Sequence, residues 1–359
     1  MGSITGSSKG SWHPTITTKT NIKSYWINWR LLLCAIWVIA AIIFSSFLIW
    51  KYECFRRKNS RNGNRERREE TTPATLYEDE TWRPCLKGIH PAWLLTFRVV
   101  AFFLLLVLLI VNAIVDGGSI FYYYTQWTFT SITIYFGLGS LLSMYGCYQH
   151  HKKSNGDKVD NVDGDAEHGT DTSTAFALPL SSNPSNQEKK LGATEEDLVP
   201  QHASTWGYIF QIMFQMNAGA VMLTDCVFWF IMVPFLTIKD YNLNFLAVLM
   251  HTINAAFLLG DTILNSLRFP WFRIGYFCLW TLTYVIFQWI VHACINIWWP
   301  YPFLDLSSRF APLWYLIVGF LHIPCYGIFT LMMKLKHYVL STRYPDSYQV
   351  LNDFRLGPK

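Results

Sequence analysis

The chain has 359 residues, of which 52% are hydrophobic and only 15% are charged. Soluble globular domains carry about 25% charged residues, so this composition excludes an ordinary soluble protein and indicates several membrane-spanning helices. The formal net charge of +5 does not predict nucleic-acid binding, because the basic residues lie in polar segments between apolar runs. The cysteines form no Cys-x-x-Cys pair, so neither a zinc ribbon nor a thioredoxin motif is predicted.

Residues 1–30 are polar and are predicted to form a disordered tail. Seven apolar runs follow, and each is long enough to cross a bilayer, which takes about 20 residues. The predicted spans are approximately Leu31–Trp50, Ala92–Val115, Ile120–Tyr148, Trp206–Leu236, Leu243–Leu267, Ile274–Trp299 and Leu313–Met333. We therefore expect an all-α integral membrane protein, a polytopic bundle of about seven transmembrane helices.

The polar segments predict how the bundle is oriented. A basic segment, 51–91, follows the first span, and the core of six helices, 92–337, contains a polar segment, 154–203, that is expected to be a disordered loop. With the N-terminus outside, the inner segments, the last of which is 334–359 with the tail 338–359, hold 22 of the 29 Lys and Arg residues. This asymmetry favours an exterior or lumenal N-terminus and a cytoplasmic C-terminus, in the endoplasmic reticulum or the plasma membrane. Arg98, near one end of the second span, is expected to extend toward the interface.

Several polar and ionisable side chains fall inside the apolar runs. Each is costly at membrane depth unless it faces a partner or a cavity. Two spans carry such residues along one face at 100° per residue. They are His251, Asn254, Asp261 and Asn265 on the fifth span, and Gln211, Gln215 and Asp225 on the fourth. These stripes predict either hydrogen bonds between helices or a functional site.

Threonine and histidine residues at similar depths suggest a chemistry for such a site. They are Thr125 or Thr128 on the third span, His251 on the fifth, His292 on the sixth and His322 on the seventh. A neutral histidine can take the proton of a hydrogen-bonded threonine and so make its oxygen a nucleophile. Asp225 is a candidate for orienting that histidine, whereas Asp261 lies too near the cytoplasmic end to reach His251.

Four short motifs gather around these residues. They are Tyr123-Tyr-Thr-Gln-Trp127, Asp225-Cys-Val-Phe-Trp229, His251-Thr252 and Trp298-Trp-Pro-Tyr-Pro-Phe-Leu-Asp305. Together they resemble the androgen-induced multi-span membrane proteins and their rolling stone relatives, in a plant-type form, over about 92–337.

The resemblance implies an activity and its residues. In the androgen-induced branch, an intramembrane threonine and a histidine hydrolyse fatty acid esters of hydroxy fatty acids. Carried over to this sequence, the histidine is His251 and the threonine is Thr125, with Thr128 as the alternative and with Asp225 and His292 in support. The rolling stone branch, to which this chain looks closer, has no agreed enzyme activity.

Three functional hypotheses follow. The first is a lipid esterase that uses Thr125 and His251 without a metal or cofactor, with membrane lipids around it and a lipid ester as substrate. The second is a non-enzymatic membrane interaction or signalling protein, in which the polar stripes only fix helix packing and the protein partners are unknown. The third is a metal-dependent hydrolase that uses His251, His292 and His322, although no His-x-x-x-His or His-Glu-x-x-His spacing supports it.

Overall fold

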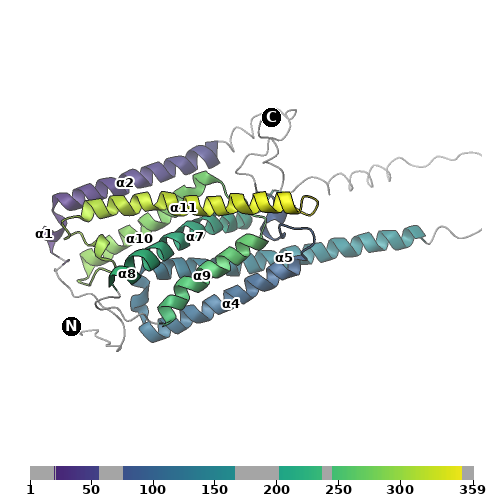
Figure 1. Ribbon diagram of the computed structural model, residues 1–359, viewed down its shortest axis with the longest axis horizontal. Coiled ribbons are helices and arrows are strands. Elements are labelled where there is room, and N and C mark those ends of the chain that lie inside the picture. Colours follow the sequence, from purple (N-terminus) through teal and green to yellow (C-terminus); the bar gives the residue numbers. More distant parts are fainter. Residues whose placement is uncertain (1–19, 21, 56–75, 166–201, 237–244, 350–359) are drawn as a thin grey trace, which may run out of the picture.

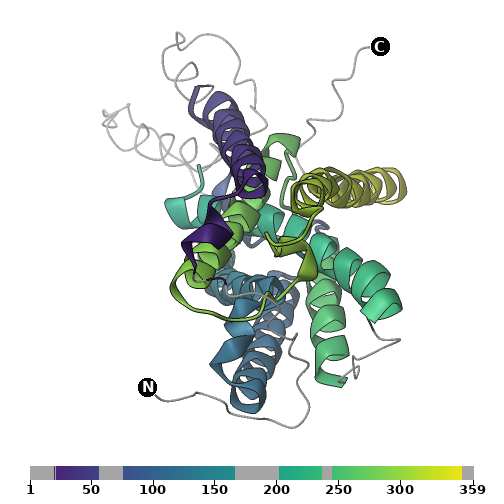
Figure 2. The same cartoon turned by 90° about the vertical axis from the view of Figure 1, so that its left-hand side faces the viewer.

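The computed structural model describes residues 20, 22–55, 76–165, 202–236 and 245–349. Within these ranges the chain is a bundle of seven long helices that run roughly parallel or antiparallel to one another (Figures 1 and 2). They are α2 (Trp29–Ile49), α4 (Pro91–Asp116), α5 (Tyr124–Asp165), α7 (Thr205–Val227), α9 (Phe245–Leu264), α10 (Ile274–Cys294) and α11 (Ala311–Arg343). The predicted all-α membrane bundle is therefore confirmed.

Short elements connect or extend these helices. Two are α-helical, α1 (Lys23–Trp26) and α8 (Val233–Leu236). Two are π-helical, Trp50–Phe55 and Phe228–Met232. Four are 3-10 helices, at Glu78–Thr81, Gly118–Tyr122, Trp271–Arg273 and Pro302–Leu304.

Six of the described helices are long and apolar enough to cross a membrane. The remaining long helix, α5, is more polar, but α4 ends and α7 begins at opposite ends of the bundle, and α5 runs the length between them (Figure 1). Its side chains Phe129, Ile132 and Phe136 are completely buried. We therefore count α5 as the seventh traverse, one whose polar groups face protein instead of lipid.

Some helix limits differ from the predicted spans. α5 begins at Tyr124 because Gly117, with a φ of 73°, allows a tight turn before the 3-10 helix that follows it. α5 then continues to Asp165, into the segment 154–203 for which a disordered loop was expected. α11 continues to Arg343, well beyond the predicted limit. Within the predicted tail 1–30, α1 forms and α2 begins at Trp29, so that part is ordered. Residues 1–19 and 166–201 lie outside the described part of the chain.

The core has two main apolar clusters, and α7 contributes to both. One cluster joins α4, α5, α7, α9 and α11 around buried side chains such as Leu105, Phe214 and Leu258. The other joins α2, α5, α7, α10, α11 and residues 299–304, and it includes Phe277. A Cβ atom at Gly219 would lie 2.4 Å from the Phe277 ring, so α7 and α10 approach closely only because residue 219 has no side chain.

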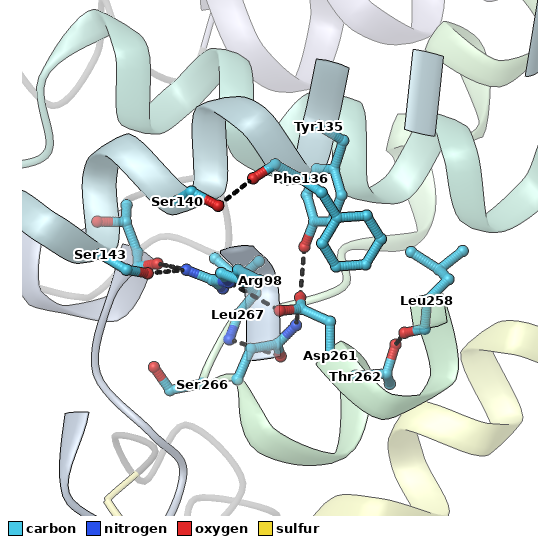
Figure 3. A network of polar contacts seen from close by, with 12 residues as sticks. Arg98, Tyr135, Phe136, Ser140, Ser143, Leu258, Asp261, Thr262, Ser266 and Leu267 are labelled. Carbon is cyan, nitrogen blue, oxygen red and sulfur yellow. Dashed lines mark hydrogen bonds and ion pairs between the residues drawn. The ribbon is translucent and has the colours of Figure 1, made fainter. Parts of the chain in front are cut away.

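A buried ion pair links α4 to α9. Arg98 Nε lies 2.7 Å from Asp261 Oδ1, and both side chains are 0% exposed. Tyr135 donates to Asp261 Oδ2 at 2.5 Å, and Asn265 Nδ2 donates to the same oxygen at 2.9 Å (Figure 3). Arg98 Nη1 donates to Ser143 Oγ at 2.8 Å. The expectation that Arg98 reaches the interface is therefore wrong, because a fully buried carboxylate holds it inside the bundle.

The segment 76–90, part of the basic segment 51–91, packs on the same end of the bundle. Arg98 Nη1 also donates to the Thr81 carbonyl oxygen at 2.8 Å. Glu80 is buried and accepts from Arg268 Nη2 at 2.8 Å and Nε at 3.0 Å. A backbone hydrogen bond joins the Cys85 amide to the Leu264 carbonyl oxygen. This part of the segment is consequently an ordered cap on α4, α9 and the loop that follows α9.

At the other end, α1 is tied to the loop that follows α10. The Tyr25 hydroxyl donates to Asp305 Oδ1 at 2.8 Å and accepts from Trp299 Nε1 at 3.1 Å. Burial, and then the Asp305 carboxylate, raise the pKa of Tyr25, which keeps the hydroxyl protonated as a donor. Asn28 caps α2 by accepting from the Leu31 amide at 2.9 Å.

We predict that Asp261→Ala lowers the free energy of unfolding in detergent by about 3–5 kcal/mol, because it leaves Arg98 buried without its countercharge. The double variant Arg98→Met, Asp261→Leu is expected to recover most of this loss, since an apolar pair needs no desolvation of charge. Thermal unfolding checks both. Asp116→Ala, at the exposed end of α4, is the control. If Asp261→Ala is no less stable than Asp116→Ala, the ion pair is not a stabilising element.

Candidate functional site

A small cavity lies where the four sequence motifs meet. Its volume is about 60 Å³, room for about two water molecules at about 30 Å³ each. Its wall includes Tyr124 and Thr125 of the first motif, Phe228 of the second, His251 of the third, and Tyr301, Phe303 and Leu304 of the fourth. Segments more than 170 positions apart in the sequence thus surround one space.

The first turn of α5 is fixed by hydrogen bonds from α10. Tyr284 Oη and Gln288 Nε2 both donate to the Tyr122 carbonyl oxygen, each at 2.7 Å. Trp127 Nε1 donates to the Phe121 carbonyl oxygen at 2.9 Å. These bonds satisfy backbone carbonyls in the 3-10 turn that precedes α5. They therefore determine where the threonines of the first α5 turns lie.

Thr125 and Thr128, the two candidate nucleophiles, have different environments. Thr125 is half-buried and lines the cavity, with its Oγ1 3.4 Å from the Tyr301 hydroxyl oxygen. Thr128 is completely buried and is not among the described lining residues. A reacting group in the cavity can reach Thr125 without unpacking α5, so the geometry favours Thr125.

His251 is oriented by two residues at the end of α7. Its Nδ1 lies 3.1 Å from Asp225 Oδ1, and its ring stacks on Phe228 with the centroids 3.8 Å apart and the planes 11° apart. Phe228 begins the π-helical turn Phe228–Met232. Such turns are rare and occur often at functional sites. With Nδ1–H donating to the carboxylate, Nε2 is the nitrogen that carries the lone pair.

The motif 298–305 forms another side of the cavity. Pro302–Leu304 is a 3-10 turn that begins with proline, which suits the first position of a helix. Tyr301 and Phe303 stack with their ring centroids 5.1 Å apart. Because Asp305 is held by Tyr25, the N-terminal part of the chain helps to position this wall.

A further threonine and histidine form a hydrogen-bonded chain beside the cavity. The Tyr124 and Thr281 hydroxyl oxygens lie 2.8 Å apart, and Thr281 Oγ1 lies 2.9 Å from His322 Nε2. His322 Nδ1 lies 2.8 Å from the Val318 carbonyl oxygen. Nδ1 must therefore be the protonated nitrogen, so Nε2 accepts from Thr281. Thr281 is not distinguished in the sequence, because nothing in the apolar run of α10 separates it from Thr283.

The other residues that the sequence analysis selected lie elsewhere. His292 stacks on Trp299 with the centroids 3.6 Å apart, and its Nδ1 donates to the Gln288 carbonyl oxygen at 2.8 Å. It thereby packs against the motif 298–305 without being one of the described lining residues. Asp261 pairs with Arg98 at the opposite end of α9. The polar stripe of α9 consequently contributes to two separate sites, with His251 at the small cavity and Asp261 in the ion pair with Arg98.

The histidines of the metal hypothesis do not come together. His251 contacts Asp225, His292 contacts Trp299, and His322 contacts Thr281. Within the described ranges, no three His, Cys, Asp or Glu side chains gather as a metal-ligand set. A structural or catalytic zinc ion needs at least three such protein ligands, so the geometry gives the metal-dependent hydrolase no site among these residues.

Comparisons with known proteins identify no relative of this chain. No family model matches the chain, and no curated protein or solved structure shows a significant similarity to it.

We predict that Thr281→Val lowers the free energy of unfolding by about 1–3 kcal/mol, because it leaves the Tyr124 hydroxyl and His322 Nε2 buried without their shared partner. Thr283→Val is the matched control on the same helix, since that threonine is exposed and bonds only the Leu279 carbonyl oxygen. Thermal unfolding in detergent measures both. Equal stability of the two variants would show that the buried hydrogen-bonded chain contributes nothing.

Proposed function

We propose that the protein is a membrane-embedded hydrolase of fatty acyl esters, with Thr125 as nucleophile and His251 as general base. The observation that carries the proposal is that Thr125 and His251 line one cavity while Asp225 binds the far nitrogen of His251. A nucleophile, a base and a group that orients the base are the parts that acyl transfer needs. The resemblance of the four motifs to the androgen-induced branch supports the same reaction.

The proposed reaction has two halves. His251 Nε2 takes the Thr125 proton as Oγ1 attacks the ester carbonyl carbon, and Tyr301 Oη, 3.4 Å from Oγ1, donates to the developing oxyanion. As the intermediate collapses, the ester C–O bond breaks and His251 gives its proton to the leaving alkoxide. A water molecule then attacks the acyl-threonine with His251 again as base. The products are a fatty acid, an alcohol and free Thr125.

Asp225 acts in this proposal through His251. By accepting from Nδ1–H, its carboxylate fixes the tautomer and stabilises the imidazolium that forms when Thr125 is deprotonated. The face-to-face contact with Phe228 holds the ring plane. Catalytic hydrogen bonds are often long in free enzymes and shorten when substrate binds, so we expect Thr125 and His251 to close on each other around the ester.

The alternative is a membrane interaction protein of the rolling stone type. In that case Asp225, His251 and Thr125 stabilise the packing of α5, α7 and α9 and nothing more, since polar residues in membrane helices commonly hydrogen-bond a neighbouring helix. The position of Thr125 and His251 on the wall of a cavity favours the enzyme, because groups that serve packing alone have no need of an accessible space.

We predict that purified protein in detergent reacts with a fluorophosphonate probe and hydrolyses long-chain acyl esters. Thr125→Ala should abolish labelling, because it removes the attacking oxygen. His251→Gln should lower the hydrolysis rate by about 10²- to 10⁴-fold, the usual contribution of a general base. Thr128→Ala is the matched control, three residues along the same helix, and should keep most of the activity.

Two results would count against the proposal. Well-folded wild type that takes no label and hydrolyses no acyl ester would leave the interaction protein as the better description. Loss of labelling in Thr128→Ala, with retention in Thr125→Ala, would move the nucleophile to Thr128. Thermal unfolding of each variant separates loss of fold from loss of chemistry.

We also infer the orientation from the distribution of charge. The bundle has seven traverses, and the basic residues concentrate at the end where α2 finishes and α4 begins, so that end is placed on the cytoplasmic side. The proposal puts the chain in the endoplasmic reticulum or the plasma membrane. The small cavity then lies toward the exterior or lumenal half.

A protease-protection experiment tests this orientation. Epitope tags at the two ends of the chain, in sealed vesicles with the cytoplasmic face outward, should behave oppositely. We predict that the C-terminal tag is digested and the N-terminal tag is protected until detergent is added. The reverse pattern would invert the topology, and equal digestion of both tags would contradict an odd number of traverses.

A further inference from the structure

A second and larger cavity lies between α2, α10 and α11. Its volume is about 460 Å³, within the range of about 300–1,000 Å³ that is usual for small-molecule sites. Apolar side chains from all three helices line it, among them Phe44 and Leu48 of α2, Leu282 and Val285 of α10, and Ile323 of α11. An apolar ligand is therefore the chemistry that fits most of its wall.

Small residues create this space. A Cβ atom at Gly275 would lie 2.9 Å from the Ser45 carbonyl oxygen, so α2 and α10 touch closely at one point. Gly319 also lines the cavity and is exposed, and a Cβ atom added there would have no neighbouring atom within 4 Å. The helices are thus held together beside the cavity, while its opening at Gly319 is free of side chains.

The large cavity and the small cavity share part of their walls. The shared residues are Thr281, Val285, Phe303, Leu304 and Val318. The small cavity, at about 60 Å³, can hold a reacting ester group but not the chain attached to it. The large cavity lies next to it and is big enough for about 15 methylenes, if each takes about the 30 Å³ of a water molecule.

Polar side chains line the large cavity at and beside the shared wall. Thr281 belongs to that wall, and its partner His322 is buried and also lines the large cavity. Thr281 donates to His322, so the Tyr124 hydroxyl is the donor in the Tyr124–Thr281 hydrogen bond. A hydroxyl can rotate to suit its partners, so the Tyr124 hydrogen can turn from Thr281 to a new acceptor. Tails of bulk lipid offer no acceptor at this depth, whereas a carbonyl oxygen does.

We propose that the cavity between α2, α10 and α11 binds one long acyl chain, with the carbonyl end at Thr281, where the two cavities meet. The tail lies against Phe44, Leu282 and Ile323, and the carbonyl oxygen accepts from the Tyr124 hydroxyl. The inference deepens the proposed function, because it gives the ester substrate its chain-binding site. Chain binding itself requires no turnover and is tested without it.

The test uses a probe that cannot be hydrolysed. A long-chain methyl ketone that carries a diazirine and an alkyne near the far end is incubated with the full-length protein in lipid nanodiscs and irradiated, and labelled peptides are identified by mass spectrometry. We expect label on α2, α10 and α11. An unlabelled methyl ketone should compete, and the ether of the same length, which has no carbonyl, should compete about tenfold less well.

Two glycines on α11 provide a matched pair of variants. Gly319→Leu places a side chain in the opening of the large cavity and should lower labelling about tenfold, the loss expected when two or so methylenes lose their contacts. Gly327→Leu is the control, because a Cβ there also meets nothing within 4 Å and the residue is not among those described as lining the cavity. Thermal unfolding confirms that both variants fold.

The outcomes separate this inference from the proposed function. Label spread evenly over lipid-facing helices, or equal labelling of Gly319→Leu and Gly327→Leu, would overturn the chain site. Equal competition by ketone and ether would overturn the placement of the carbonyl. Labelling as expected in a protein that hydrolyses no ester would uphold the chain site and reject the hydrolase. Hydrolysis without selective labelling would uphold the hydrolase and reject the chain site.

Discussion

The arrangement of the bundle depends on the ion pair between Arg98 and Asp261. Two fully buried charges in a membrane protein are tolerable only when they meet each other and have further hydrogen-bond partners, and here Tyr135 and Asn265 supply partners for the carboxylate. The pair fixes the rotation of α9 about its axis. Since His251 lies on the same face, ten residues or about 15 Å earlier at 1.5 Å per residue, the pair also aims His251 at α7.

Helix α7 is the element on which the two halves of the protein pack. One of its faces belongs to the apolar cluster with α5 and α9, and the other to the cluster with α10 and α11. The small cavity opens where these clusters meet, just before the π-helical turn at Phe228. Asp225 and Phe228 are three residues apart and so lie on one side of the helix, which lets both contact His251.

Much of the fold could be predicted from the sequence, because apolar length and periodicity report directly on membrane helices. The polar stripe on α9 likewise predicted a buried face, and His251, Asn254, Asp261 and Asn265 are all buried. Pairings between helices could not be predicted. Arg98 was predicted to reach the interface, because the sequence around it does not indicate a contact with Asp261, 163 positions away. Thr281 was overlooked because its importance depends on Tyr124 and His322, which only the folded chain brings to it.

The N-terminal part of the chain lies outside the six-helix core, 92–337, over which the family resemblance extends. Yet Tyr25 holds the loop that covers the small cavity, and α2 supplies a full side of the large one. Both therefore belong to the packed bundle. A shortened chain that starts after α2 would have a groove between α10 and α11 in place of the large cavity, with the Thr281–His322 bond at its floor. Under the proposed function, a homologue without such a helix would need another wall for the acyl chain.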